Sequence, residues 1–360
     1  MTMTRCNHKR GTAKTTVGHT RAMSLGFGLL SAQLRPGETD WSRVYTETVE
    51  LAVEAERIGF SSVWTTEHHF VDDGYMPSLA VVSAAIAAAT AEIEIGTGVI
   101  LAPLHHPLRL AEDAATVQLL SGGRFILGLG LGWNEVEFTG LGADRRLRGA
   151  AMEEILSILP RAWGGEPFRH DGRVYHLPEI AVRPTPPAPI PVLIGGGAEA
   201  AVRRAARLAD GIFANVPKEA FLRQLDWIRD ECERIDRDPA ELRIVHYSVM
   251  LPGTSEQAAT ERYTDHLWQM MWKYSDMEAS ATRSGPPPEA PPLDDGQRNS
   301  LYARATVAGT SEQIVDYLLS IRESAGMNVE FVARSYFPTL DHDDQVELMQ
   351  HLAEEVSPHV

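Results

Sequence analysis

Cysteine, positive charge and long apolar runs are all scarce in this sequence of 360 residues. The two cysteines, Cys6 and Cys232, are too few for a disulfide framework or a thiolate metal site, which fits a reducing compartment. Lysine and arginine number 33 against 49 acidic residues, and the formal net charge of −16 argues against nucleic acid or an anionic membrane as a partner. The longest apolar run, Leu79 to Ala91, is too short to span a bilayer. We therefore expect a cytoplasmic globular protein.

The first 22 residues lack acidic side chains and an apolar core. They carry basic residues without the apolar segment of a secretory signal, so we expect residues 1–22 to form a disordered arm. Met23, directly before the first expected strand, is an alternative start of the chain. Residues 23–360 are expected to form a single domain, because barrels of this length are common.

Apolar periodicity predicts eight short strands that alternate with helices. The expected strands cover residues 23–31, 61–66, 93–101, 125–131, 192–194, 211–214, 242–251 and 329–333. Such alternation is typical of a parallel sheet, and eight units favour an α/β fold of the (β/α)8 TIM-barrel type with insertions. A doubly wound sheet usually carries a glycine fingerprint after its first strand, whereas Gly26 and Gly28 lie inside the strand here.

Two segments do not fit the regular alternation and are expected to be insertions. Residues 164–191 are rich in proline and predict a hairpin at Asp171-Gly172. Residues 264–300 combine a helix rich in tryptophan and methionine with a proline-rich acidic stretch, and we expect them to form a lid. The alternative for this helix is ordinary core or a dimer interface. Capping-box spacing predicts that helices begin at Thr254 and at Thr310.

Three reactive side chains, Glu67, His68 and His69, follow the second expected strand. In a barrel, the carboxyl ends of the strands form the catalytic face. Histidine can take or give a proton near neutral pH, so these three residues are candidate catalytic groups. All three are also metal-ligand types, but adjacent residues of an extended chain point to opposite sides. The one other histidine pair near an expected strand end is His105-His106, and we expect no metal.

Glycine-rich turns and one arginine suggest a cofactor site at the same face. Gly98 and Val99 close the third strand, where glycine marks a bulge or a close approach of a ligand, or only tight packing. Arg109 can offer two donors to a phosphate, although such an arginine is commonly a surface residue or salt-bridge partner. A run of glycines opens a helix after the fifth strand, which suits an anion or a simple turn. That run and its neighbour are Gly195, Gly196, Gly197 and Ala198.

These motifs, in this order, resemble the bacterial luciferase-like flavin monooxygenase family over nearly the whole chain from Met23 onward. The residues that carry the resemblance are Thr66 to Phe70, Gly96-Thr97, His106-Pro107 with Arg109, Glu112 and Asp113, Ser121 to Phe125, Gly128, Glu137-Phe138, Gly140, Gly142, Pro191 to Gly197 and Ala209 to Gly211. The resemblance implies a TIM barrel that binds reduced FMN, or the deazaflavin F420, at its carboxyl-end mouth.

The resemblance also implies roles for individual residues. His68 would act in acid/base handling of the flavin peroxide. Gly98-Val99 would form a non-proline cis peptide behind the flavin ring. Arg109 would bind the flavin phosphate, with Gly196 and Gly197 on its other side. Glycine stands here where luciferase has polar side chains, which leaves both FMN and F420 open.

The function expected from this resemblance is a two-component monooxygenase. It would use reduced FMN from a separate flavin reductase, and O2, to oxidise a small organic substrate, and we expect a homodimer. Aromatic and apolar residues near strand ends suggest an apolar or aromatic pocket. These residues are Trp64, Phe70, Tyr75, Met76 and Trp133. The alternatives are an F420-dependent oxidoreductase that transfers hydride, and a flavin-binding protein without turnover.

Overall fold

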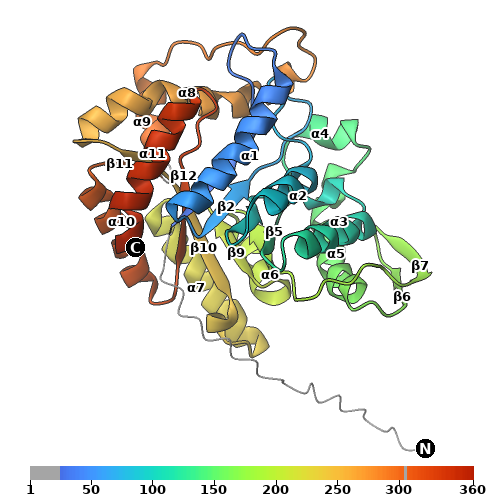
Figure 1. The fold of residues 1–360 in the computed structure, drawn as a ribbon. Coiled ribbons are helices and arrows are strands. Elements are labelled where there is room, and N and C mark those ends of the chain that lie inside the picture. The colour runs from blue at the N-terminus through green and yellow to red at the C-terminus, as the bar shows by residue number, and fades with distance from the viewer. Residues whose placement is uncertain (1–24, 304–305) are drawn as a thin grey trace, which may run out of the picture.

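Eight parallel strands close into a barrel in the computed structural model, which describes residues 25–303 and 306–360 (Figure 1). The predicted arm at 1–22 and the alternative start at Met23 lie outside the described residues. Around the barrel the strands are β1 (Gly26–Leu30), β2 (Ser62–Thr65), β3 (Glu94–Thr97), β5 (Phe125–Gly130), β8 (Val192–Gly195), β9 (Gly211–Ala214), β10 (Arg243–Pro252) and β12 (Glu330–Arg334). Pairing of β12 with β1 and of β9 with β10 closes the ring, which confirms the predicted TIM barrel.

Helices pack around the outside of the barrel (Figure 1). They are α1 (Trp41–Ile58), α2 (Leu79–Ala89), α3 (Pro107–Leu120), α5 (Arg148–Trp163), α6 (Glu199–Leu208), α7 (Lys218–Ile235), α10 (Ser311–Ala325) and α11 (His342–Glu355). The predicted capping box at Thr310 and Gln313 is present at the start of α10. Among the described residues, none of the helices is long and apolar enough to cross a membrane.

Two local predictions were wrong. The cap of the helix after β10 is Ser255, not Thr254, since the Ser255 side chain accepts a hydrogen bond from the Ala258 N–H. The third predicted strand is broken: β3 ends at Thr97, and β4 (Ile100–Leu101) pairs with β5. The Gly98–Val99 peptide between the two pieces is cis. A periodicity rule cannot detect such a break, because the apolar pattern continues through it.

The barrel interior is filled by side chains and is not a pore. Trp64 of β2 and Phe213 of β9 stack with ring centroids 4.4 Å apart, and Phe213 and Tyr247 stack at 4.3 Å. Val99 and Tyr247 pack on this inner cluster while remaining partly exposed. They therefore form part of the floor of the mouth, above a close-packed interior.

The first predicted insertion is a hairpin. Its strands, β6 (Phe168–Asp171) and β7 (His176–Ile180), pair antiparallel and lie beside α5 (Figure 1). A short helix that the sequence analysis did not predict, α4 (Glu135–Gly140), follows β5.

The second insertion begins directly after β10. It contains α8 (Glu256–Ser280), α9 (Asp295–Tyr302) and β11 (Thr306–Gly309), which extends the sheet along the end of β10. Figure 1 shows α8 and α9 together above β11, on the side of the barrel that carries α11.

A cluster of buried ion pairs connects α8 to the loop between β2 and α2. The Lys273 amine lies 2.8 Å from Asp72, 3.2 Å from Asp276 and 3.8 Å from Asp73, and its side chain is only 2% exposed. Arg283 pairs with Asp72 and with Asp276. Because burying charges is costly unless each finds a partner, these groups stabilise α8 only as a complete set.

Replacing Lys273 with methionine should therefore destabilise the fold. The variant keeps most of the side-chain volume but leaves the three carboxylates without their central cation, and we expect a loss of about 3–5 kcal/mol in the free energy of unfolding. Urea denaturation measures this loss. Lys218→Met is the matched control, since the Lys218 amine contacts a hydroxyl, that of Ser320. Equal stability of the two variants would contradict the role given to the cluster.

Candidate active site

The turn after β2 directs its three reactive side chains to two sides. Glu67 and His69 contact each other, with the carboxylate 2.9 Å from the His69 ring, while His68 turns to a different partner. This alternation is that of an extended chain. Phe70 then takes a positive φ of 59°, and its ring lies against Gly140 of α4. A Cβ at Gly140 would lie 2.4 Å from that ring, so the close approach requires glycine.

His68 is held by a carboxylate that the sequence analysis did not assign to the site. The His68 Nδ1 lies 2.8 Å from the Glu137 carboxylate, and both side chains are buried. The same oxygen of Glu137 accepts the backbone N–H of His69 at 2.9 Å. Because the carboxylate accepts from Nδ1–H, Nε2 is the ring nitrogen left for proton transfer. The one sequence signal for Glu137 was its place in the family-like Glu137-Phe138 pair.

Three aromatic rings surround His68. Its ring centroid lies 4.7 Å from that of Tyr75, 5.6 Å from Tyr274 and 6.1 Å from Trp133, each in an edge-on arrangement. Tyr274 belongs to α8, so the second insertion contributes to the site. The predicted aromatic surroundings are thus present through Tyr75 and Trp133.

Other members of the predicted aromatic pocket lie elsewhere. Trp64 is fully buried in the barrel interior, and Met76 is buried in the main core between the barrel and its helices. Phe70 is exposed and rests on Gly140. Proximity to a strand end did not distinguish core residues from mouth residues.

Glu67 links three segments of the chain. One of its oxygens accepts hydrogen bonds from His69 at 2.9 Å, from His105 at 3.1 Å and from the Leu101 N–H at 3.3 Å. Burial would raise the pKa of Glu67, but the bonds to His105 and His69 lower it below the ordinary value. Burial would likewise lower the pKa of His105, but Glu67 raises it. The pair therefore favours its charged form.

Glu67, His69 and His105 are also metal-ligand types, with ligand atoms within 4.8 Å of one another. The sequence argument against a metal noted the pair His105-His106 but did not foresee that His105 lies next to Glu67 and His69. Two ligands of a tetrahedral zinc ion lie roughly 3.3 Å apart. The separations of 2.9 and 3.1 Å from the shared Glu67 oxygen are those of hydrogen bonds. The absence of a metal stays a prediction.

Val99 and the glycines around it form a shallow cradle. A Cβ at Gly130 would lie 2.4 Å from the Val99 side chain, and one at Gly195 would lie 2.7 Å from it. Only glycine at these two positions lets Val99 sit between β5 and β8. Val99 is partly exposed above the inner cluster, which provides an apolar seat for a flat ring.

The turn after β8 exposes backbone rather than side chains. Gly196 has a φ of 146°, a conformation that favours glycine, and Gly196 and Gly197 are exposed. Ala198 precedes α6 without a side-chain cap, so the first N–H groups of that helix receive no hydrogen bond from a capping side chain. An anionic group fits there, and the seat at Val99 fits a flavin ring.

Arg109 lies at the start of α3 with a side chain that is 70% exposed. It pairs with Asp113 at 2.9 Å and Glu112 at 3.6 Å on its own helix. Within the described ranges, no hydrogen bond or ion pair joins it to the turn at Gly195 to Ala198. The structure thus places Arg109 as a surface ion-pair partner, without bringing it against the other predicted phosphate residues.

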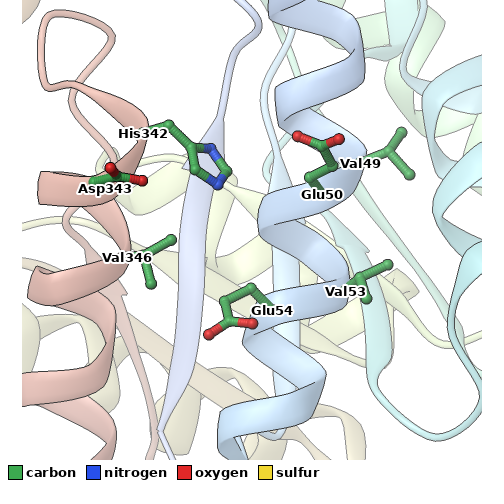
Figure 2. A pocket seen from close by; sticks show the side chains of 7 residues that line it. All are labelled: Val49, Glu50, Val53, Glu54, His342, Asp343 and Val346. Atoms are coloured by element: carbon green, nitrogen blue, oxygen red, sulfur yellow. The ribbon is translucent and has the colours of Figure 1, made fainter.

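A groove on the outer surface is separate from this site. It lies between α1 and α11, on the outside of the barrel (Figure 2). Its lining residues are Val49, Glu50, Val53, Glu54, His342, Asp343 and Val346. None of the predicted site residues lines it, so the barrel mouth remains the candidate active site.

Glu67→Gln tests the charge link within the turn. The amide removes the anion next to His105 while burial remains, so the pKa of His105 should fall below its ordinary value. Nuclear magnetic resonance titration of the imidazole measures it. Glu154→Gln is the control, because Glu154 pairs with His170 on the hairpin side. A pKa of His105 that is the same in both variants would show that Glu67 does not hold it.

Comparison with known proteins gives relatives that use two different cofactors. The chain is 30% identical over 201 residues to an F420-dependent glucose-6-phosphate dehydrogenase of Kineococcus radiotolerans, a match covering 54% of this chain and 56% of that protein. It is 30% identical over 146 residues to the oxygenase component of a flavin-dependent trigonelline monooxygenase of Acinetobacter baylyi, a match covering 40% of each. The chain spans about half the length of the curated relatives it matches.

Solved structures support the fold over nearly the whole chain. The monooxygenase RslO1 from Streptomyces bottropensis superposes with a TM-score of 0.79 at 22% identity, covering 94% of this chain and 99% of that one. A family model described as luciferase-like monooxygenase matches residues 23–328. The chain therefore belongs to the luciferase-like monooxygenase family, a family of oxidoreductases.

Proposed function

We propose that this protein is a monooxygenase that uses reduced FMN and O2 to oxidise a small organic substrate. The observation that carries the proposal is His68, held by the buried Glu137 carboxylate at the same barrel mouth as the Val99 cradle. A separate flavin reductase would supply the reduced FMN, and the working form would be a homodimer.

The cofactor would be held by backbone and apolar contacts more than by charged side chains. Gly98 and Val99 would support the flavin ring from behind. The exposed turn at Gly195, Gly196, Gly197 and Ala198 would receive the phosphate through backbone N–H groups. Arg109 would leave its ion pairs on α3 to reach that phosphate. When bound, reduced FMN supplies the electrons that activate O2.

The side chains after β2 would manage one proton. His68 Nε2 would take or give it at the reactive edge of the ring, while Glu137 keeps the imidazole in one tautomer. Glu67 and His69 would hold the turn in place through their shared hydrogen bond. The α8 insertion, which places Tyr274 against His68, would act as a lid that excludes water.

The second candidate is an F420-dependent oxidoreductase that transfers hydride without O2. The glycines at 195–197 favour it, since they offer no polar side chains to an FMN phosphate. Relatives of both kinds match the chain. A flavin-binding protein without turnover is the third candidate, and the His68–Glu137 pair argues against it.

Anaerobic fluorescence titration with reduced FMN and with reduced F420 separates the first two candidates, and Arg109→Ala tests the phosphate contact. We expect saturable FMN binding, weakened roughly 10-fold or more in Arg109→Ala because a charge-assisted hydrogen bond is lost. Arg57→Ala is the control, since Arg57 is an exposed arginine paired with Glu54 on its own helix. Tight binding of F420 without binding of FMN would reject the monooxygenase, and unchanged FMN affinity in Arg109→Ala would reject the role of Arg109.

His68→Asn tests the proton-transfer role. With a substrate found by O2 uptake across a panel of organic compounds, kcat should fall about 10²–10⁴-fold, the usual worth of a positioned acid or base. The dissociation constant for FMN should stay nearly unchanged, because His68 is not proposed to hold the phosphate. The exposed His176→Asn is the control. Full kcat in His68→Asn would contradict the role, and a panel without any substrate-dependent O2 uptake would favour a non-catalytic flavin-binding protein.

A further inference from the structure

Arg334 is a buried cation without an acidic partner. It ends β12 at the barrel mouth, and it is 8% exposed. Its Nη2 donates a hydrogen bond of 2.8 Å to the hydroxyl of Tyr274. In the part of the chain that the structure describes, no carboxylate lies within ion-pair distance of its guanidinium.

Other buried cations among the described residues are paired. Arg204 on α6, which is 8% exposed like Arg334, lies 3.2 Å from Glu153. Lys273 has three carboxylates around it. Burying an ion is costly when no partner compensates it, and this sequence has 49 acidic residues against 33 basic ones. Arg334 therefore lacks a countercharge that the fold supplies to comparable groups.

The tyrosines near Arg334 do not provide that charge. Burial raises the pKa of Tyr247 to about 12 and that of Tyr75 well above its ordinary value, so both phenols are neutral at pH 7. The Arg334 guanidinium carbon lies 5.6 Å from the centre of the Tyr274 ring, close enough for a cation–π contact. These rings orient the guanidinium but do not neutralise its positive charge, so the guanidinium can bind an anionic ligand.

Arg334 also lies close to the proposed reaction centre. The Tyr274 hydroxyl that accepts its hydrogen bond lies 3.0 Å from the Tyr75 hydroxyl. Both tyrosine rings contact the ring of His68, with centroids 4.7 and 5.6 Å away. One layer of aromatic rings therefore separates Arg334 from His68. A molecule whose anionic group binds Arg334 would thus lie close to His68.

We propose that Arg334 binds the carboxylate of the substrate, and that the substrate class is small organic carboxylates with an apolar or aromatic body. The planar guanidinium matches a carboxylate through two parallel hydrogen bonds. The body of the substrate packs against Tyr75, Tyr247 and Tyr274. This inference rests on the proposed function, since it names the substrate class of the same site.

Matched acid and amide probes test the inference by calorimetric titration of the FMN-saturated protein. The pairs are benzoate with benzamide and hexanoate with hexanamide, whose members differ mainly in charge. We expect at least one acid to bind 10-fold or more tightly than its amide. In Arg334→Met that preference should disappear while amide binding persists, and Arg334→Lys should keep part of it.

The control variant is Arg262→Met, because Arg262 is an exposed arginine of α8 that pairs with Glu347. It should keep the full preference for the acid. Equal affinity of acid and amide in the wild type, no measurable binding of either acid, or a preference that survives in Arg334→Met would each overturn the inference. If Arg334→Met does not fold, Tyr274→Phe replaces it. Loss of the hydroxyl that orients the guanidinium should reduce the preference several-fold, and an unreduced preference would count against the inference.

The same measurements separate this inference from the proposed function. They are repeated on flavin-free protein, so that they do not depend on FMN binding. A preference for acids that requires Arg334, without O2 uptake on any compound, would reject the monooxygenase and keep the carboxylate site. O2-dependent turnover of neutral substrates alone, without binding of acids, would keep the monooxygenase and reject the carboxylate site.

Discussion

Two buried carboxylates hold the turn after β2, and the candidate site depends on them. Glu137 accepts hydrogen bonds from the His68 ring and from the backbone of His69, while Glu67 accepts them from His69, His105 and the backbone of Leu101. Together they connect the turn to α4 and to the segment after β4. A buried carboxylate is costly unless donors surround it, so each of these groups imposes one geometry on its neighbours.

The same principle of pairing buried charge fixes the position of the second insertion. Lys273 and Arg283 bind the aspartates of the β2–α2 loop, which brings Tyr274, on the same helix, to His68. The insertion is thus attached to the loop between β2 and α2, and not only to the strand from which it departs. Among the buried cations that the structure describes, Arg334 is the exception because it has no carboxylate partner. It lies at the mouth, where a ligand can supply the anion.

Local sequence patterns predicted the barrel well, because the buried face of each strand and helix sets the spacing of its apolar residues. The eight strands and the hairpin at Asp171-Gly172 follow from such patterns. The break at Gly98-Val99 altered a predicted strand without altering its apolar pattern. The error at Thr254 has a similar origin, since the adjacent Ser255 is an equally good capping residue and only the backbone geometry selects it.

The sequence by itself determined the fold class, and it proposed the strand-end face as the candidate site, with His68, Glu67 and His69 as its polar residues. Only the tertiary structure decided which partners they have. Glu137 lies 69 residues from His68, and Tyr274 lies 60 residues from Arg334. Periodicity and motif spacing give information only about residues that are near one another in the sequence. These long-range contacts form because a closed parallel barrel brings the carboxyl ends of its strands, and the segments that follow them, to one mouth.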